Sequence, residues 1–122
     1  MFLFDTKNQK SFIEKEMPKG NDKYKEYQKL VGGHIETIPH PQGWDAPFTA
    51  YANEEGMLQD LPSNFLAWGV LRHLGFVVPS IGFYFGNVVL IGHNGKGVTA
   101  ANKKLVHEAQ RKYLAEMQEE KD

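Results

Sequence analysis

His34 and Glu36 are the first residues of the chain whose types and spacing could do chemistry. An imidazole beside a carboxylate can carry out acid–base catalysis, and residues two apart in a β-strand point to the same face. We expect such a strand over residues 31–39, where Gly32 and Gly33 would admit a neighbouring backbone or helix. A solvated strand face also explains the two polar side chains, because half-buried strands ordinarily alternate in this way. We prefer that interpretation and keep His34 and Glu36 as a secondary candidate site.

The glycine-rich loop before the last predicted helix is a candidate anion site. Backbone N–H groups in such turns can converge on a phosphate, and the start of a helix adds a favourable dipole. The loop is not a Walker loop, because the glycine spacing and the Lys-Ser/Thr pair of that motif are absent. A surface turn explains the same residues equally well. The candidate ligand-binding residues here are His93, Asn94, Gly95, Lys96, Gly97 and Thr99.

Aromatic residues are numerous for so short a chain, with eight Phe, five Tyr and two Trp. Most aromatic side chains belong in a core. Phe83, Tyr84 and Phe85 begin an apolar strand, one face of which could stack a base or form an oligomer interface. Trp44 lies in a proline-rich loop. We favour the core for most of these residues and keep Phe83 and Phe85 as ligand-binding candidates.

The residues for other catalytic or metal chemistry are missing or badly spaced. The chain has no Cys, which excludes thiolate nucleophiles and thiolate metal sites. It has no Gly-x-Ser-x-Gly elbow, and its five His residues include no pair at the i, i+4 spacing of helical zinc ligands. Glu54 and Glu55 fit a solvated turn. We therefore expect no metal, no cofactor and no enzymatic activity.

Hydrophobic periodicity and turn residues locate the elements that must position these candidates. Helix-like spacing covers residues 6–17, and residues 22–29 form a short helical turn before the strand over 31–39. A second strand is expected over 48–53. A helix follows from Pro62–Ser63 to a glycine stop at Gly75. The final helix begins at Thr99 and shows an apolar face that consists of Leu105, Ala109, Tyr113 and Met117.

The apolar segment 83–91 has two interpretations. Gly86–Asn87 is either the turn of a hairpin or an irregularity in one long strand, and the sequence leaves both open. In either case the order of elements predicts an α+β fold: a small antiparallel, or mixed, sheet with helices packed on one side and a C-terminal helix. We expect one domain over residues 1–122, with an N-terminal helical extension over 1–29, a core over 30–117 and a frayed tail over 118–122.

The charge balance excludes two classes of function. Fourteen basic and fifteen acidic residues give a net charge of −1. A non-specific nucleic-acid binder is usually basic, and a DNA mimic needs a large acidic excess, so neither role is expected. Residues 76–91 are apolar but broken by proline and glycine, and the N-terminus lacks a signal-peptide pattern. We expect a cytoplasmic protein without a membrane span.

Four stretches of sequence occur in an order that matches a known family. They are residues 31–36 (Val-Gly-Gly-His-Ile-Glu), 53–56 (Asn-Glu-Glu-Gly), 61–64 (Leu-Pro-Ser-Asn) and 86–92 (Gly-Asn-Val-Val-Leu-Ile-Gly). Over residues 28–110 the chain resembles domain of unknown function 3846, a small family of phages and conjugative elements without established function. The chain departs from the family pattern at residues 40–46 and 76–85. The positions that match are Gly32, Gly33, Glu36, Asn64 and Gly86.

The resemblance implies an origin in a mobile element but carries over no catalytic residue. By analogy, we expect a non-enzymatic accessory protein that forms a homo-oligomer in the host cytoplasm and counters host defence by sequestering a nucleotide-like ligand. One alternative is an inhibitor or adaptor of a host protein. A second alternative is an enzyme that uses His34 and Glu36.

Overall fold

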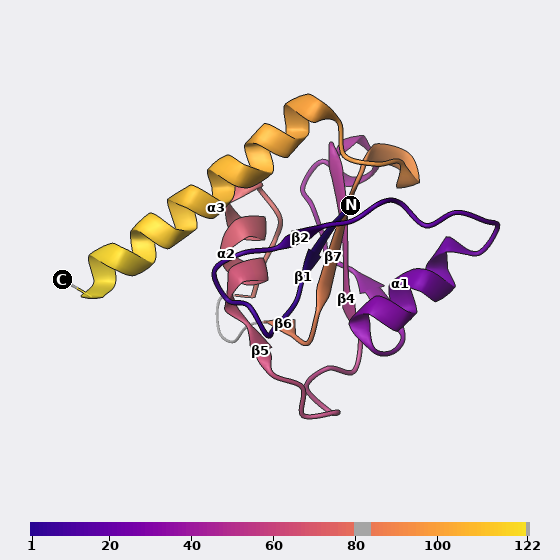
Figure 1. The fold of residues 1–122 in the computed structure, drawn as a ribbon, viewed down its shortest axis with the longest axis horizontal. Helices are drawn as coiled ribbons and strands as arrows, with labels where there is room; N and C mark the ends of the chain where they lie inside the picture. The colour runs from indigo at the N-terminus through magenta and orange to yellow at the C-terminus, as the bar shows by residue number, and fades with distance from the viewer. Residues whose placement is uncertain (80–83, 122) are drawn as a thin grey trace.

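Five antiparallel strands form the main sheet in the computed structural model, which describes residues 1–79 and 84–121 (Figure 1). In spatial order they are β2 (Ile13–Glu14), β1 (Phe2–Phe4), β7 (Val88–Gly92), β4 (Phe48–Asn53) and β3 (Ile35–Thr37). Two further strands, β5 (Ser63–Asn64) and β6 (Tyr84–Phe85), form a small antiparallel pair. The predicted α+β class and the antiparallel sheet are confirmed.

Helices cover both faces of the main sheet, so the prediction that all helices pack on one side is wrong for α1. Figure 1 shows α2 (Phe65–His73) and α3 (Ala100–Lys121) on one side and α1 (Lys23–Val31) on the other. Short 3-10 turns, η1 (Gly43–Asp45) and η2 (His93–Gly95), lie in two of the loops. A sheet covered on both faces needs strands that are apolar on both faces, as the run Val-Val-Leu-Ile of β7 is.

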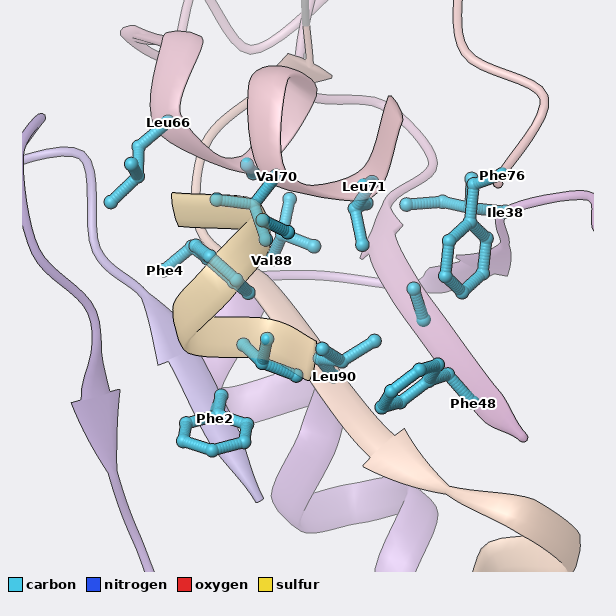
Figure 2. Packing of buried hydrophobic residues seen from close by; sticks show 14 of the residues in the cluster. Phe2, Phe4, Ile38, Phe48, Leu66, Val70, Leu71, Phe76, Val88 and Leu90 are labelled. Carbon is cyan, nitrogen blue, oxygen red and sulfur yellow. The ribbon is translucent and has the colours of Figure 1, made fainter. Parts of the chain in front are cut away.

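The first strand, β1, packs inside the sheet between β2 and β7. Figure 2 shows Phe2 and Phe4 beside Val88 and Leu90 in the larger core cluster, where none of the four side chains is exposed. Residues 1–29 are therefore not a helical extension outside the core. Within the predicted helical stretch 6–17, the structure instead has β2, which pairs with β1. Three consecutive apolar residues make too short a signal for a strand buried on both faces.

The Gly32–Gly33 pair ends a helix, and it does not open a strand. The helix α1 continues through Val31, and Gly32 follows with φ of 84°, its N–H bonded to the carbonyl of Gln28. Only glycine adopts this left-handed conformation without steric cost, which is why it commonly follows a helix end. The strand β3 starts at Ile35, four residues later than the predicted start at residue 31.

The remaining elements follow the predictions more closely. The strand β4 has the expected bounds, 48–53. The helix α2 begins after Asn64, whose side-chain oxygen accepts a hydrogen bond from the N–H of Ala67, and Gly75 beyond its end has φ of 91°. Gly86–Asn87 is neither a hairpin turn nor an irregularity, because β6 pairs with β5 while β7 pairs with β1 and β4. At this point the chain passes from the small sheet to the main one.

The helix α3 begins where the sequence predicts, with the Thr99 hydroxyl accepting a hydrogen bond from the N–H of Asn102 at 3.2 Å. Ala109 and Tyr113 are buried against the core. Ion pairs from the end of α2, made by Arg72 and His73, hold Glu116 further along α3. The helix continues to Lys121, through most of the tail for which we predict fraying. No helix among the described residues is long and apolar enough to span a membrane.

Candidate ligand-binding site

The two parts of the predicted ligand site lie at opposite ends of β7. Phe85 in β6 precedes this strand and the loop from His93 to Gly97 follows it. Five residues of extended chain, at about 3.4 Å each, place roughly 17 Å between them. Phe83 lies outside the described residues. The structure therefore does not bring Phe85 and the glycine-lysine loop together into one site.

A cavity of about 670 Å³ lies beside part of the predicted loop. This volume is within the range of small-molecule sites. Its walls come from the start of α1, from β3 and β4, from the proline-rich loop between those strands and from η2. The residues are Tyr24, Thr37, Ile38, Pro39, His40, Gly43, Trp44, Phe48, Thr49, Tyr51, Asn94 and Gly95. Aromatic rings and neutral polar groups thus surround the cavity.

Three tyrosines form one side of this region. Tyr51 of β4 stacks on Tyr27 of α1, with ring centroids 5.2 Å apart and planes 25° apart. Tyr24 meets Tyr51 edge-on at 6.1 Å. Burial raises the pKa of Tyr51, and its hydrogen bond with Tyr24 raises it further. The phenol of Tyr51 therefore stays neutral at physiological pH and can act as a hydrogen-bond donor.

Trp44 supplies the most exposed aromatic surface at the cavity. Its side chain is 91% exposed, although an indole is one of the largest apolar groups a protein can bury. The neighbouring wall residue Tyr24 is 59% exposed. Large aromatic surfaces that the fold leaves in water, beside a concave site, are typical of surfaces that bind something. Trp44 and Tyr24 are therefore the exposed aromatic side chains of the cavity wall.

Two histidines hold the loop that carries Trp44. The backbone N–H of Gln42 donates to Nδ1 of His40 at 3.1 Å, so the other ring nitrogen carries the proton and donates to the carbonyl of Leu74 at 3.3 Å. The ring of His40 also packs edge-on against Phe76, with centroids 4.9 Å apart. His93 Nδ1 lies 3.0 Å from the carbonyl of Ala46, to which it donates. Both rings position the loop and are engaged with protein groups.

The glycine-lysine loop contributes only its tip to the cavity. Asn94 and Gly95 have left-handed φ angles of 54° and 75° and line the wall. The N–H of Gly92 donates to the carbonyl of Lys96, and the N–H of Lys96 donates to that of His93, so these two donors close the turn. Lys96, Gly97 and Thr99 are not among the described residues that form the wall. Those same wall residues include no Lys or Arg.

His34 and Glu36 lie away from the cavity on the other face of β3. Glu36 is paired in register with Ala52, which belongs to the core on the α2 side, whereas Thr37 is paired with Tyr51 on the α1 side. Partial desolvation raises the pKa of Glu36, whose side chain is still exposed, and the nearby Glu54 carboxylate raises it further. Within residues 1–79 and 84–121, no hydrogen bond or ion pair joins Glu36 to His34. The same residues contain no group of three side chains able to hold a metal ion.

Two of the positions that carry the family resemblance, Gly33 and Asn64, have structural roles in the fold. Asn64 is fully buried and donates from Nδ2 to the carbonyls of Phe4, at 2.8 Å, and Gly86, at 2.9 Å. A side chain on Gly33 would lie 3.1 Å from Nδ2 of Asn53. The family model of the domain of unknown function (DUF3846) matches residues 3–117. The chain belongs to this family. No curated protein and no solved structure gives a significant match.

Sequence reasoning missed most of the aromatic wall of this DUF3846 protein. Tyr24 and Tyr51 come from elements that are 27 residues apart in the sequence and meet only because α1 folds across β4. The sequence places Trp44 in a proline-rich loop, because prolines disfavour a strand there. That position does not indicate whether the side chain is exposed or which side chains lie beside it.

Proposed function

We propose that this DUF3846 protein is a non-enzymatic binding protein whose cavity holds a planar ring, with a nucleoside or nucleotide as the leading ligand class. The observation that carries the proposal is the exposed Trp44 beside a cavity walled by Tyr24 and Tyr51. Stacking on an aromatic side chain contributes about 1–3 kcal/mol per base and accepts every base, because each base has a π-face.

Each part of the wall would have a separate role in such a complex. Trp44 and Tyr24 would cover the faces of the ring. The side-chain amide of Asn94 and the hydroxyl of Thr37 would hydrogen-bond to its edges, as polar groups in apolar pockets do to fix orientation. A phosphate would lie outside the wall, where Lys96 follows the η2 turn. Sequestration of a nucleotide signal by a homo-oligomer encoded by a phage or related element, inside the host cytoplasm, is the biological setting that we propose.

Titration calorimetry against nucleosides, their 5′-monophosphates and cyclic nucleotides tests this proposal. We expect heat from at least one member, and an affinity about tenfold or more weaker in Trp44→Ala. The control is Leu58→Ala, which removes another apolar side chain that is 86% exposed but does not line the cavity. The proposal fails if no member gives heat, or if the Trp44 and Leu58 variants bind alike.

A protein–protein inhibitor or adaptor is the second candidate function. Met57 and Leu58 lie together in the turn after β4, where they are 68% and 86% exposed. Adjacent apolar side chains in water are one mark of a protein contact. A host protein retained by the wild type and lost from a Met57→Lys, Leu58→Lys variant would favour this candidate.

The enzyme hypothesis at His34 predicts chemical change of a ligand during incubation, abolished in His34→Ala.

A further inference from the structure

We propose that the open edge of β3 binds an extended, basic segment of a partner protein as an added strand. The strand β3 ends the spatial order of the main sheet and pairs only with β4 among the described strands. An extended peptide can continue a sheet at such an edge, where main-chain hydrogen bonds give affinity and alternate side chains give specificity. This proposal does not rest on the cavity function proposed above, although Thr37 belongs both to this edge and to the cavity wall.

The hydrogen bonds to β4 show which backbone groups of β3 point away from the sheet. The N–H of Ile38 donates to the carbonyl of Ala50 at 2.9 Å, and the N–H of Glu54 donates to the carbonyl of His34 at 2.8 Å. Residues 34, 36 and 38 therefore face β4. Because backbone groups alternate in direction along a strand, those of Ile35 and Thr37 point away from the sheet. No hydrogen bond within residues 1–79 and 84–121 engages these outward groups of Ile35 and Thr37, whereas the carbonyl of Pro39, the next outward residue, accepts from the N–H of Val77 at 2.9 Å.

The charge beside this edge selects the chemistry of the partner. Glu36 is exposed at the centre of β3, and Glu54 lies close enough for its carboxylate to disfavour ionisation of Glu36. Neither carboxylate forms an ion pair within the part of the chain that the structure describes. A Lys or Arg side chain on the added strand would relieve this repulsion. The pair thus complements a basic segment.

A second copy of β3 is a poorer occupant of the same edge. Symmetric antiparallel pairing about the centre of β3 would set Glu36 opposite the Glu36 of the other copy, and like charges directly opposite each other are destabilising. On the other face of β3, Thr37 lies beside Tyr51 and forms part of the cavity wall. A segment that alternates basic and aromatic residues would place its positive charges beside Glu36 and its rings beside Thr37.

Fluorescence anisotropy with a labelled eight-residue peptide of alternating Lys and Tyr tests the proposal. One control peptide carries N-methyl groups on alternate backbone amides, and a second has Glu in place of each Lys. The protein variant is Thr37→Pro, which removes an outward N–H and leaves the hydrogen bonds between β3 and β4 in place, because proline is tolerated on edge strands in that position. Glu54→Gln tests the charge, with Glu55→Gln as its matched control on the neighbouring exposed carboxylate.

We expect the Lys–Tyr peptide to bind and both control peptides to bind at least about tenfold more weakly. Thr37→Pro should weaken binding of the Lys–Tyr peptide by a similar factor, and Glu54→Gln should weaken it more than Glu55→Gln does. Equal binding of the N-methylated peptide to the wild-type protein overturns the proposal even if the proline variant fails to fold. Absence of binding by the Lys–Tyr peptide also overturns it. Nucleotide binding by the wild type and by Glu54→Gln, whose substituted residue does not line the cavity, reports separately on the cavity.

Discussion

Replacing Asn64 with alanine should lower the free energy of unfolding by about 3–5 kcal/mol. Asn64 is 0% exposed and joins three elements. Its Nδ2 donates to the carbonyl of Phe4 in β1 and to that of Gly86 at the passage between the sheets, while Oδ1 caps α2 at Ala67. Losing the cap costs about 1 kcal/mol, and each buried carbonyl left without a donor costs roughly 1–2 kcal/mol. The sum is a large part of the stability of a small domain, about 5–15 kcal/mol.

Urea unfolding followed by circular dichroism measures this difference. Asn64→Asp keeps the capping oxygen but removes both Nδ2 donors and sets a negative charge beside two carbonyls, so we expect it to be at least as destabilising as alanine. The control is Asn21→Ala in the exposed turn before α1, with an expected change within about 0.5 kcal/mol. If the free energy of unfolding of Asn64→Ala falls by less than about 1 kcal/mol, the hydrogen bonds of Asn64 do not stabilise the packing of these elements as we infer.

Two further variants probe packing and charge. Gly69→Ala would place a Cβ 2.0 Å from Cδ1 of Tyr113. We expect urea unfolding to show a free energy of unfolding lower by about 1–3 kcal/mol, although alanine gains about 1 kcal/mol in helix propensity. Unchanged stability would show that α2 and α3 are not in this contact. The pKa of Glu36 is raised in the folded state by burial and by Glu54, so ionisation penalises folding above the unfolded pKa of about 4.3. Glu36→Gln should therefore raise stability at pH 7 and leave it unchanged at pH 3, whereas a destabilised variant at pH 7 would contradict this reasoning.

The elements that the sequence predicts well are those whose signals are local. The side chains of β4 point alternately to the two faces of the sheet, and the strand lies between a proline-rich loop and a turn that contains glycine. Its bounds are as predicted. The start of α2 follows a proline and a capping residue, and Asn64 provides the cap. Thr99 likewise caps α3. Capping and turn residues act within four residues of one another, so tertiary structure has little scope to override them.

The wrong predictions concern residues whose environment is set by distant parts of the chain. Phe2 and Phe4 become core residues because β7, more than eighty positions later, pairs with β1. The Gly32–Gly33 pair fits either a strand irregularity or a helix end, and only the extent of α1 decides between them. Gln9 illustrates the same limit: its side chain accepts a hydrogen bond from the N–H of Phe65 at the start of α2, a contact without local sequence signal.

The same limit applies to the predicted ligand-binding residues. Of the predicted loop residues, Asn94 and Gly95 line the cavity, and the sequence alone does not place Trp44 beside them. The pairing of β4 with β7 brings η2 to one end of the sheet and leaves Phe85 near the other. Proximity in sequence to the same strand therefore gave the wrong grouping, and the aromatic partner of the loop is Trp44 and not Phe85.

An NMR titration of ¹⁵N-labelled protein with the nucleoside and nucleotide panel tests the cavity proposal most directly. The two indole N–H signals provide an internal comparison, because Trp44 lines the cavity whereas the Trp68 indole donates to the carbonyl of Pro79 at 2.9 Å. We expect saturable shifts for the Trp44 indole and for the amides of Gly43 and Gly95, with little change for Trp68. Shifts confined to residues outside the cavity, or no shift with any member of the panel, would contradict it.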